Sequence, residues 1–306
     1  MANEFLLTGT LSENKSLDAS HIWTLERRVI VPSGVTLTIP AGTIIKATPG
    51  TGANATSLII ARGGTINAEG TADSPIIFTS TSDNISIGQS FGSSLSEKVR
   101  GLWGGLLILG NAPCSFSGDV VEQQIEGIPA SETNGLYGGS DPADNSGVLR
   151  YVSIRHGGAE IGEGNEINGL TLGGVGTGTT IENIEVVGNV DDGIEFFGGT
   201  VNASGLLVWG QGDDGLDIDQ AYAGTISNSM VILNEASDHA LEIDGPEGSA
   251  PGRFTLDGLT LIGTNDECAP TGVDGEIADY RKGATGDNNN IYVTNFTAGK
   301  DIELDK

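Results

Sequence analysis

One stretch of the chain decides the fold, because a short motif recurs in it at a nearly constant interval. Its copies read Asp192-Gly193-Ile194-Glu195-Phe196, Asp214-Gly215-Leu216-Asp217-Ile218-Asp219 and His239-Ala240-Leu241-Glu242-Ile243-Asp244, after an earlier Asn168-Gly169-Leu170-Thr171-Leu172. Counted between first residues, the steps are 24, 22 and 25 residues. Apolar and polar residues alternate inside each copy, which predicts a short β-strand with one face in the core.

A second series of apolar runs alternates with the first along the chain. It is centred on Val186, Val208, Val231, Leu261 and Val293, with steps of 22, 23, 30 and 32 residues. Upstream, Val152-Ser153-Ile154 and Leu106-Leu107-Ile108-Leu109 have the same character. Two strand types that alternate at a period just above twenty residues predict a solenoid, in which stacked coils bury the apolar face that no coil can bury alone.

The predicted fold is therefore all-β: a single-domain, right-handed parallel β-helix with long loop insertions. No stretch sustains helical periodicity, and Gly and Asn can supply left-handed corners between the strands. A β-sandwich is the alternative, but the Asn-Gly turns that join neighbouring strands of hairpins are scarce. We expect one domain over 1–306, with N-terminal coils over 1–110, a loop-bearing middle over 111–160 and acidic coils over 161–306.

Three segments interrupt the period, at 80–100, 112–147 and 264–288. We expect each of them to be an exposed loop. Long excursions from a regular solenoid are where binding surfaces usually lie.

The charge is strongly negative and unevenly distributed. With 14 Lys and Arg against 41 Asp and Glu the net charge is −27, and 161–306 alone contributes −21 of it. This excess of acid argues against nucleic acid as a partner, because phosphate binding needs clustered basic residues. No apolar segment is long enough to be a transmembrane segment.

The composition also bears on location. Lys is rare while Asn, Gly, Thr and Ser are abundant, which favours an extracellular protein. The first residues have neither the basic nor the apolar region of a signal sequence. We therefore expect a secreted or outer-surface protein whose signal sequence is absent from this chain.

The two cysteines, Cys114 and Cys268, permit one disulfide. Closing a loop of that length would stabilise the fold by roughly 3–5 kcal/mol in the chain-entropy model. Two buried free thiols are the alternative.

Several motifs together resemble one family of proteins. They are Gly101-Leu102-Trp103-Gly104-Gly105-Leu106-Leu107-Ile108-Leu109-Gly110-Asn111-Ala112-Pro113, Leu149-Arg150-Tyr151-Val152-Ser153-Ile154-Arg155-His156-Gly157-Gly158 and the Asp-Asp-Gly repeats. With the N-terminal runs over 35–45, 58–68 and 74–80 they resemble secreted β-helix proteins of Bacteroidetes and some marine Gram-negative bacteria. The resemblance implies a pectate-lyase-like superfamily fold and a secreted or cell-surface location, and it says little about activity.

The alternation places one row of acids on an outer face. Glu195, Asp217 and Glu242 point away from the core at matched positions, about 4.8 Å apart from coil to coil. Neighbouring charges at this spacing repel by roughly 1–3 kcal/mol, so a cation or protonation must relieve them. Oxygen ligands of this kind favour Ca²⁺. The candidate calcium ligands are Asp192, Glu195, Asp214, Asp217, Asp219, Glu242 and Asp244. A solvated acidic face without metal is the alternative.

The same corner also suggests catalysis. Asn189-Val190-Asp191-Asp192-Gly193, Gly212-Asp213-Asp214-Gly215, His239 and Arg281-Lys282 follow one another as the motifs of polygalacturonases do. The resemblance implies that Asp192, Asp213 and Asp214 act as acid and base, that His239 tunes the acid, and that Arg281 and Lys282 bind the uronate. This chain departs from the motifs at Val190, at the neighbours of His239 and in the adjacency of Arg281 and Lys282.

Two further expectations concern ligands. Trp209 lies at an outward position of the second series and is the best single candidate for stacking on a sugar. A uronate lyase would need a basic residue over the acidic row, and the sequence places none there.

The leading interpretation is an extracellular, calcium-stabilised β-helix that acts as a structural, adhesive or glycan-binding surface module. The alternative is a polysaccharide-cleaving enzyme, either a polygalacturonase-like hydrolase or a uronate lyase.

Overall fold

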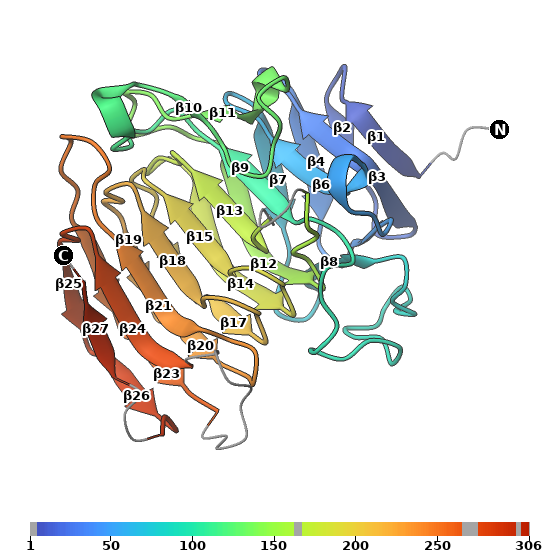
Figure 1. Cartoon of the computed structure of the whole chain (residues 1–306). Coiled ribbons are helices and arrows are strands. Elements are labelled where there is room, and N and C mark those ends of the chain that lie inside the picture. Colours follow the sequence, from blue (N-terminus) through green and yellow to red (C-terminus); the bar gives the residue numbers. More distant parts are fainter. Residues whose placement is uncertain (1–4, 162–166, 265–274, 298–300, 306) are drawn as a thin grey trace.

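The computed structural model describes residues 5–161, 167–264, 275–297 and 301–305. The strands of its large sheet stack in chain order from the N-terminal to the C-terminal end and pair in parallel (Figure 1). The prediction of a right-handed parallel β-helix is confirmed: nearly all regular structure is β, and each coil crosses three faces before it returns to the first.

Face A contains most of the residues discussed below. Its strands are the second half of β3 (Ile22–Val31), β6 (Ser57–Ile60), β9 (Leu106–Leu109), β13 (Leu170–Gly173), β15 (Ile194–Phe197), β18 (Leu216–Asp219), β21 (His239–Asp244), β24 (Glu276–Arg281) and β27 (Ile302–Leu304). Leu170, Ile194, Leu216 and Leu241 are in register, as the first repeat predicts.

Face B follows face A in each coil. Its strands are β2 (Lys15–Ser16), β4 (Thr36–Pro40), β7 (Thr65–Glu69), the first halves of β12 (Gly147–Arg155) and β14 (Thr180–Val187), β16 (Ala203–Ser204), β19 (Thr225–Ser227), β22 (Phe254–Asp257) and β25 (Gly286–Asn289).

Face C closes the coil. Its strands are β1 (Leu6–Thr10), the first half of β3, β5 (Ile44–Ala47), β8 (Ile76–Ser80), the second halves of β12 and β14, β17 (Leu207–Trp209), β20 (Met230–Ile232), β23 (Thr260–Ile262) and β26 (Tyr292–Thr294). The second repeat is confirmed here, because Val186, Val208, Val231, Leu261 and Val293 pair in sequence.

The corner between faces B and C explains part of the Gly and Asn content. In each coil from β14 onward one residue turns there with positive φ: Asn183 (56°), Gly205 (69°), Asn228 (50°), Gly258 (75°) and Asn290 (54°). In β12 the same corner is occupied by Tyr151 (48°). Gly and Asn adopt this left-handed conformation at the lowest cost, which explains their recurrence at this corner from β14 onward.

The segment 112–147 was predicted to be an exposed loop; with residue 111 we call it the cover. It includes the short pair β10 (Gln123–Gln124) and β11 (Leu136–Tyr137) and the 3-10 turns η2 (Ser117–Asp119) and η3 (Thr133–Gly135); a further turn, η1 (Gly52–Asn54), lies earlier in the chain. Its side chains Phe116, Ile125, Ile128 and Tyr137 are buried against the outer side of face A, where Phe197 lies. The prediction is wrong for these residues because they form a second, smaller apolar cluster outside the helix.

The prediction of an exposed loop over 264–288 is also wrong for the part that the structure describes. Residues 276–281 form β24 and residues 286–288 belong to β25. The excursion at 80–100 contains no strand beyond Ser80 and exposes most of its residues, among them Phe91 at 76%. Within the described residues no helix is long and apolar enough to cross a membrane.

Candidate functional site

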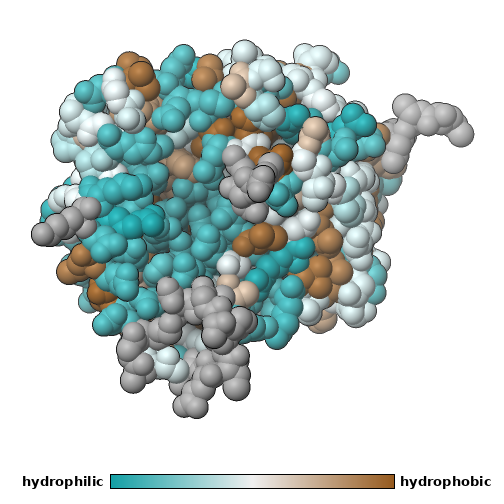
Figure 2. Space-filling model, viewed as in Figure 1, coloured by the Kyte–Doolittle hydropathy of each residue, from teal (hydrophilic) through white to brown (hydrophobic). Residues whose placement is uncertain are grey.

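The acids predicted to form a row do so on the outer side of face A. Glu195, Asp217 and Glu242 are in register on β15, β18 and β21, and Asp279 on β24 continues the row. Figure 2 shows hydrophilic side chains gathered in a hollow over these strands. We call this region the acidic furrow: Glu195, Asp217, Glu242 and Asp279, with Asp192 and Asp214 at its corner.

Sequence reasoning missed Asp279 because β24 was assigned to a loop. The local signal was present: Glu276-Ile277-Ala278-Asp279-Tyr280 contains an inward Ala278 and an outward Asp279, as in the other copies. Glu303 on β27 is paired with Asp279 one coil further on.

Much of the furrow is buried, which the interpretation as a solvated acidic face did not anticipate. Glu195 is 5% exposed, Asp192 6% and Asp214 2%, whereas Asp217 and Glu242 are half-buried. Tyr137 and Phe116 of the cover pack beside Phe197, two residues from Glu195, and this contributes to removing Glu195 from water.

Three carboxyl groups meet at the centre of the furrow. One carboxylate oxygen each from Asp192, Glu195 and Asp217 lies within 4.8 Å of the other two. Burial, and after it the charge of the neighbouring carboxylates, raises the pKa of all three groups well above the ordinary value. We call these residues the carboxylate triad.

The contacts of the carboxylate triad leave oxygens without partners. Asn168 Nδ2 donates a hydrogen bond to Glu195 Oε2, and Asp217 and Glu195 are hydrogen-bonded to each other. Asp217 Oδ1 and the buried Asn168 Oδ1 accept no hydrogen bond. Among the described residues no Lys, Arg or His forms an ion pair with the triad. An arrangement of oxygens without a basic partner suits a hard cation or shared protons.

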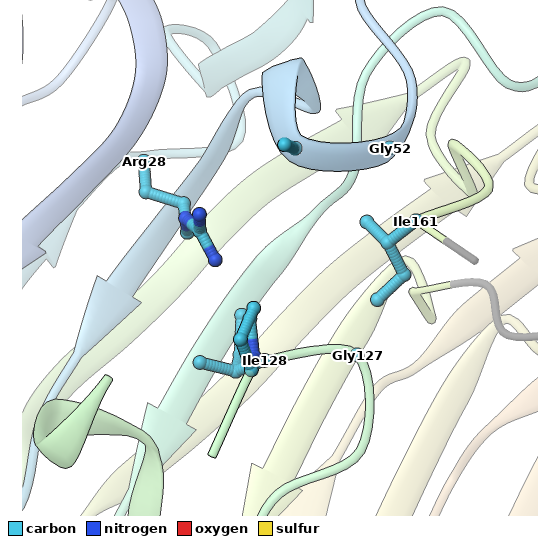
Figure 3. Close-up of a pocket in the computed structure, with 7 residues that line it drawn as sticks. Arg28, Gly52, Gly127, Ile128 and Ile161 are labelled. Carbon is cyan, nitrogen blue, oxygen red and sulfur yellow. The ribbon is translucent and has the colours of Figure 1, made fainter. Parts of the chain in front are cut away.

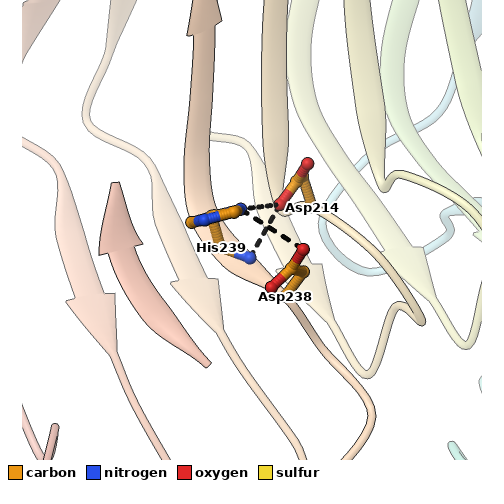
Figure 4. Close-up of side chains that lie close together, drawn as sticks. All are labelled: Asp214, Asp238 and His239. Atoms are coloured by element: carbon orange, nitrogen blue, oxygen red, sulfur yellow. Dashed lines mark hydrogen bonds and ion pairs between the residues drawn. The ribbon is translucent and has the colours of Figure 1, made fainter. Parts of the chain in front are cut away.

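The corner of the furrow is a ladder of hydrogen bonds between coils. Asp192 Oδ1 accepts from the Asp214 backbone N–H at 3.0 Å. One coil later, Asp214 Oδ1 accepts from the backbone N–H of His239 at 2.7 Å and lies 2.9 Å from its Nδ1 (Figure 4). Two of the carboxylates predicted to be catalytic therefore join successive coils, while Asp213 is exposed.

His239 is a cationic neighbour for the corner. Burial alone would lower its pKa, but the hydrogen bond and charge of Asp214, with the charges of Asp238 and Asp279, raise the pKa of His239 to about 9. Asp238 Oδ2 lies 3.6 Å from the same Nδ1 (Figure 4). At neutral pH the ring is therefore protonated and compensates the charge of Asp214.

Arg281 and Lys282 also bind acids of this protein. Arg281 Nε and Lys282 Nζ lie 2.7 and 2.6 Å from the two oxygens of Asp244, and Arg281 contacts Glu242 as well. The prediction that no basic residue lies over the acidic row is thus wrong. The predicted metal set divides accordingly: Asp192, Glu195 and Asp217 come together, whereas Glu242 and Asp244 are neutralised by bases and Asp214 by His239.

The sequence matches the family described as pectate-lyase-like β-helix domain over residues 9–306. The chain belongs to this family. Comparisons with curated proteins and with solved structures give no match.

In this pectate-lyase-like β-helix, Asp219 lies on β18, two residues after Asp217, and is not part of the carboxylate triad. Burial raises its pKa to about 6, although the hydrogen bond from the Gln220 backbone N–H opposes the shift.

Cys114 is half-buried, its thiol lies 3.4 Å from the Phe197 carbonyl, and burial raises the pKa of the thiol to about 12. Cys268, its predicted partner, lies outside the described residues.

Two cavities of the pectate-lyase-like β-helix lie away from the furrow. One, of about 270 Å³, is bounded by Arg28, Gly52, Gly127, Ile128 and Ile161 (Figure 3). The other, of about 480 Å³, lies on face C between the 80–100 excursion and Trp209. Trp209 is 39% exposed there, on a different face from Arg281 and Lys282, so the structure does not unite the three predicted substrate-binding residues.

Proposed function

We propose that this pectate-lyase-like β-helix is an extracellular surface module stabilised by calcium, with a structural, adhesive or glycan-binding role and no catalytic activity. The observation that carries the proposal is the carboxylate triad. Its oxygens lie within 4.8 Å of one another, and Asp217 Oδ1 and Asn168 Oδ1 beside them accept no hydrogen bond.

Electrostatics supports a cation at this position. Two carboxylates about 5 Å apart repel by roughly 1–3 kcal/mol even at an effective dielectric constant of 20–80, and three do so pairwise. A divalent ion would replace this repulsion by attraction. Carboxylate and amide oxygens are the ligands that Ca²⁺ prefers, and Asp192, Glu195, Asp217 and Asn168 supply both kinds.

Asp217→Asn tests the proposal, because it removes one charge and keeps the shape of the side chain. We expect about tenfold or greater loss of Ca²⁺ affinity in isothermal titration calorimetry. In EDTA the same variant should melt at a higher temperature than the wild type, because a repulsive charge has gone. Glu26→Gln, at an exposed position of β3, removes one charge elsewhere and should change neither result.

The proposal fails if Ca²⁺ gives no heat of binding and EDTA does not change the melting temperature of the wild type. The extracellular location has its own test. Fractionation of the cells that produce the full-length protein should recover it outside the cytoplasm.

A polygalacturonase-like hydrolase is the second candidate. It is favoured by the raised pKa of Asp192, suited to a general acid, and by the exposed carboxylate of the nearby Asp213 as a candidate base. Against it, oxygens of Asp191, Asp192 and Asp213 lie within 4.8 Å of one another, closer than the roughly 6.5–9.5 Å that separates the carboxyl groups of inverting hydrolases. We expect no release of reducing sugar from pectin or alginate; release that Asp213→Asn abolishes would establish the hydrolase instead.

A further inference from the structure

The cavity on face C is built from two parts of the chain that are far apart in sequence. Its floor is the outer side of β12, β14 and β17, with Arg155, Glu185 and Trp209. Its wall is the 80–100 excursion, which contributes Phe91 and Glu97. The volume of about 480 Å³ is within the range of small-ligand sites.

The floor is held rigid by hydrogen bonds. Arg155 Nε donates to Ser153 Oγ at 2.7 Å, Nη1 donates to the Ser90 carbonyl at 2.8 Å, and Nη2 lies 3.2 Å from Glu185 Oε2. The Arg155 side chain is only 14% exposed. These contacts use three of the five guanidinium N–H groups, so donors remain for a ligand.

Two aromatic rings beside this polar floor are open to solvent. Trp209 is 39% exposed and Phe91 76%, while the other two tryptophans, Trp23 and Trp103, are 3% and 0% exposed. An exposed indole ring next to fixed hydrogen-bonding groups matches the two surfaces of a pyranose, whose C–H groups pack on aromatic faces and whose hydroxyls hydrogen-bond at the edge.

Charge selects among sugars. Asp83, Glu97 and Glu185 line the cavity, and Arg155 is the one cation among the described residues that line it. His156 also lines it, but burial lowers its pKa and favours the neutral ring. With the net charge of −27, this repels uronates and sulfated sugars. The hydroxyls of a neutral sugar can instead donate to Glu97 and Glu185.

We propose that this cavity binds a neutral hexopyranose unit of a polysaccharide, stacked on Trp209. The inference rests on the glycan-binding role proposed above and specifies its location and ligand class. The site is separate from the acidic furrow, so it needs neither the carboxylate triad nor its calcium.

The test uses the full chain and two sets of oligosaccharides. The neutral set is cellohexaose, mannohexaose and galactan fragments; the acidic set is oligogalacturonate and alginate fragments. Since Trp209 is the exposed tryptophan, binding of a neutral member should protect the fluorescence from acrylamide quenching. Trp209→Ala should weaken that binding by about tenfold or more, as expected for loss of a stacking ring.

Matched variants separate this inference from the calcium proposal. Tyr292→Ala removes another exposed aromatic residue of face C and should leave sugar binding unchanged. Asp217→Asn should also bind sugar normally. Absence of binding to every neutral member, binding of acidic members alone, or neutral binding that Trp209→Ala does not weaken would each overturn the inference, while calcium binding by the triad would be unaffected. Equal melting temperatures of wild type and Trp209→Ala exclude unfolding as the cause.

Discussion

Asp214 stabilises the stacking of two coils, because one of its oxygens accepts hydrogen bonds from both the backbone and the ring of His239. Asn168, Asp192, Asp214 and His239 occupy one register position, each two residues before an inward residue of face A. The Asp-Asp-Gly repeats therefore have a structural explanation. An Asp before Gly forms a hydrogen bond to the next coil and so stabilises the corner of the solenoid.

His239→Gln should remove a pH dependence of stability. The pKa of His239 is raised to about 9 in the folded state against about 6.5 when unfolded. The folded state thus binds the proton more tightly, and the stabilisation is fully present below about pH 6.5 and is lost as pH rises through about 9. Allowing for solvent screening, we expect a loss of about 1–2 kcal/mol in the wild type over this window.

Urea unfolding at pH 6 and pH 9.5 measures this difference, with calcium held constant. The exposed His21 supplies the control, since His21→Gln also removes a titratable ring. If the stability of His239→Gln changes with pH as much as that of the wild type, Asp214 does not fix the protonation of this ring.

The cover is the element that distinguishes this solenoid from a bare stack of coils. It packs apolar side chains on face A, and Tyr137 anchors it by donating a hydrogen bond of 2.8 Å to Gln220 Oε1. Gln220 in turn donates a hydrogen bond to Glu247. The next two residues, Gly248 and Ser249, donate from their backbone N–H groups to Ser115 and Asp119 of the cover. The cover is thus attached to the segments that follow β18 and β21.

Tyr137→Phe should destabilise the protein by about 1–2 kcal/mol, because it leaves the buried Gln220 oxygen without a donor. The expected result is a lower urea midpoint and faster hydrogen exchange over 111–147. Tyr292→Phe removes a hydroxyl at an exposed ring and should change neither quantity. Equal midpoints for Tyr137→Phe and the wild type would show that the cover is attached by its apolar side chains alone.

The elements differ in how far the sequence could predict them. β15, β18 and β21 follow from alternation and a constant step, because inward and outward positions depend only on local order. β24 was missed since Glu276 pairs with His239 after an interval of 37 residues, well beyond the period. The burial of the cover and the pairing of Arg281 with Asp244 depend on contacts between distant segments, for which spacing gives no signal.

At the scale of the whole molecule, parallel stacking multiplies the effect of each acidic motif. A side chain that repeats once per coil meets its own copies at about 4.8 Å, so like charges accumulate along one line. Of the net −27, −21 lies in residues 161–306, where the acidic furrow is. The molecule can tolerate this line only where bases, protons or cations compensate it: Arg281 and Lys282 at one end, His239 at the corner and, we propose, Ca²⁺ at the triad.

The stability of the whole molecule should therefore depend on pH and calcium together. In the folded state the pKa of Asp219 is raised to about 6, and those of Asp192, Glu195 and Asp217 are raised as well. Between about pH 4 and pH 7 the folded state then binds more protons than the unfolded state, so the free energy of unfolding in EDTA falls as pH rises. Surface acids with lowered pKa, such as Asp18 and Asp287, lose their stabilising effect only below this window.

In EDTA we therefore expect a melting temperature a few degrees higher at pH 5 than at pH 7.5, since about 1–3 kcal/mol corresponds to roughly 2–5 °C in a chain of this size. Calcium should reduce or reverse the difference, because it neutralises the triad at pH 7.5 and competes with protons at pH 5. Asp217→Asn should weaken both effects, and Glu26→Gln neither. A melting temperature in EDTA that rises from pH 5 to pH 7.5 would mean that the triad is not under electrostatic strain, and the physical reason for placing a cation there would be lost.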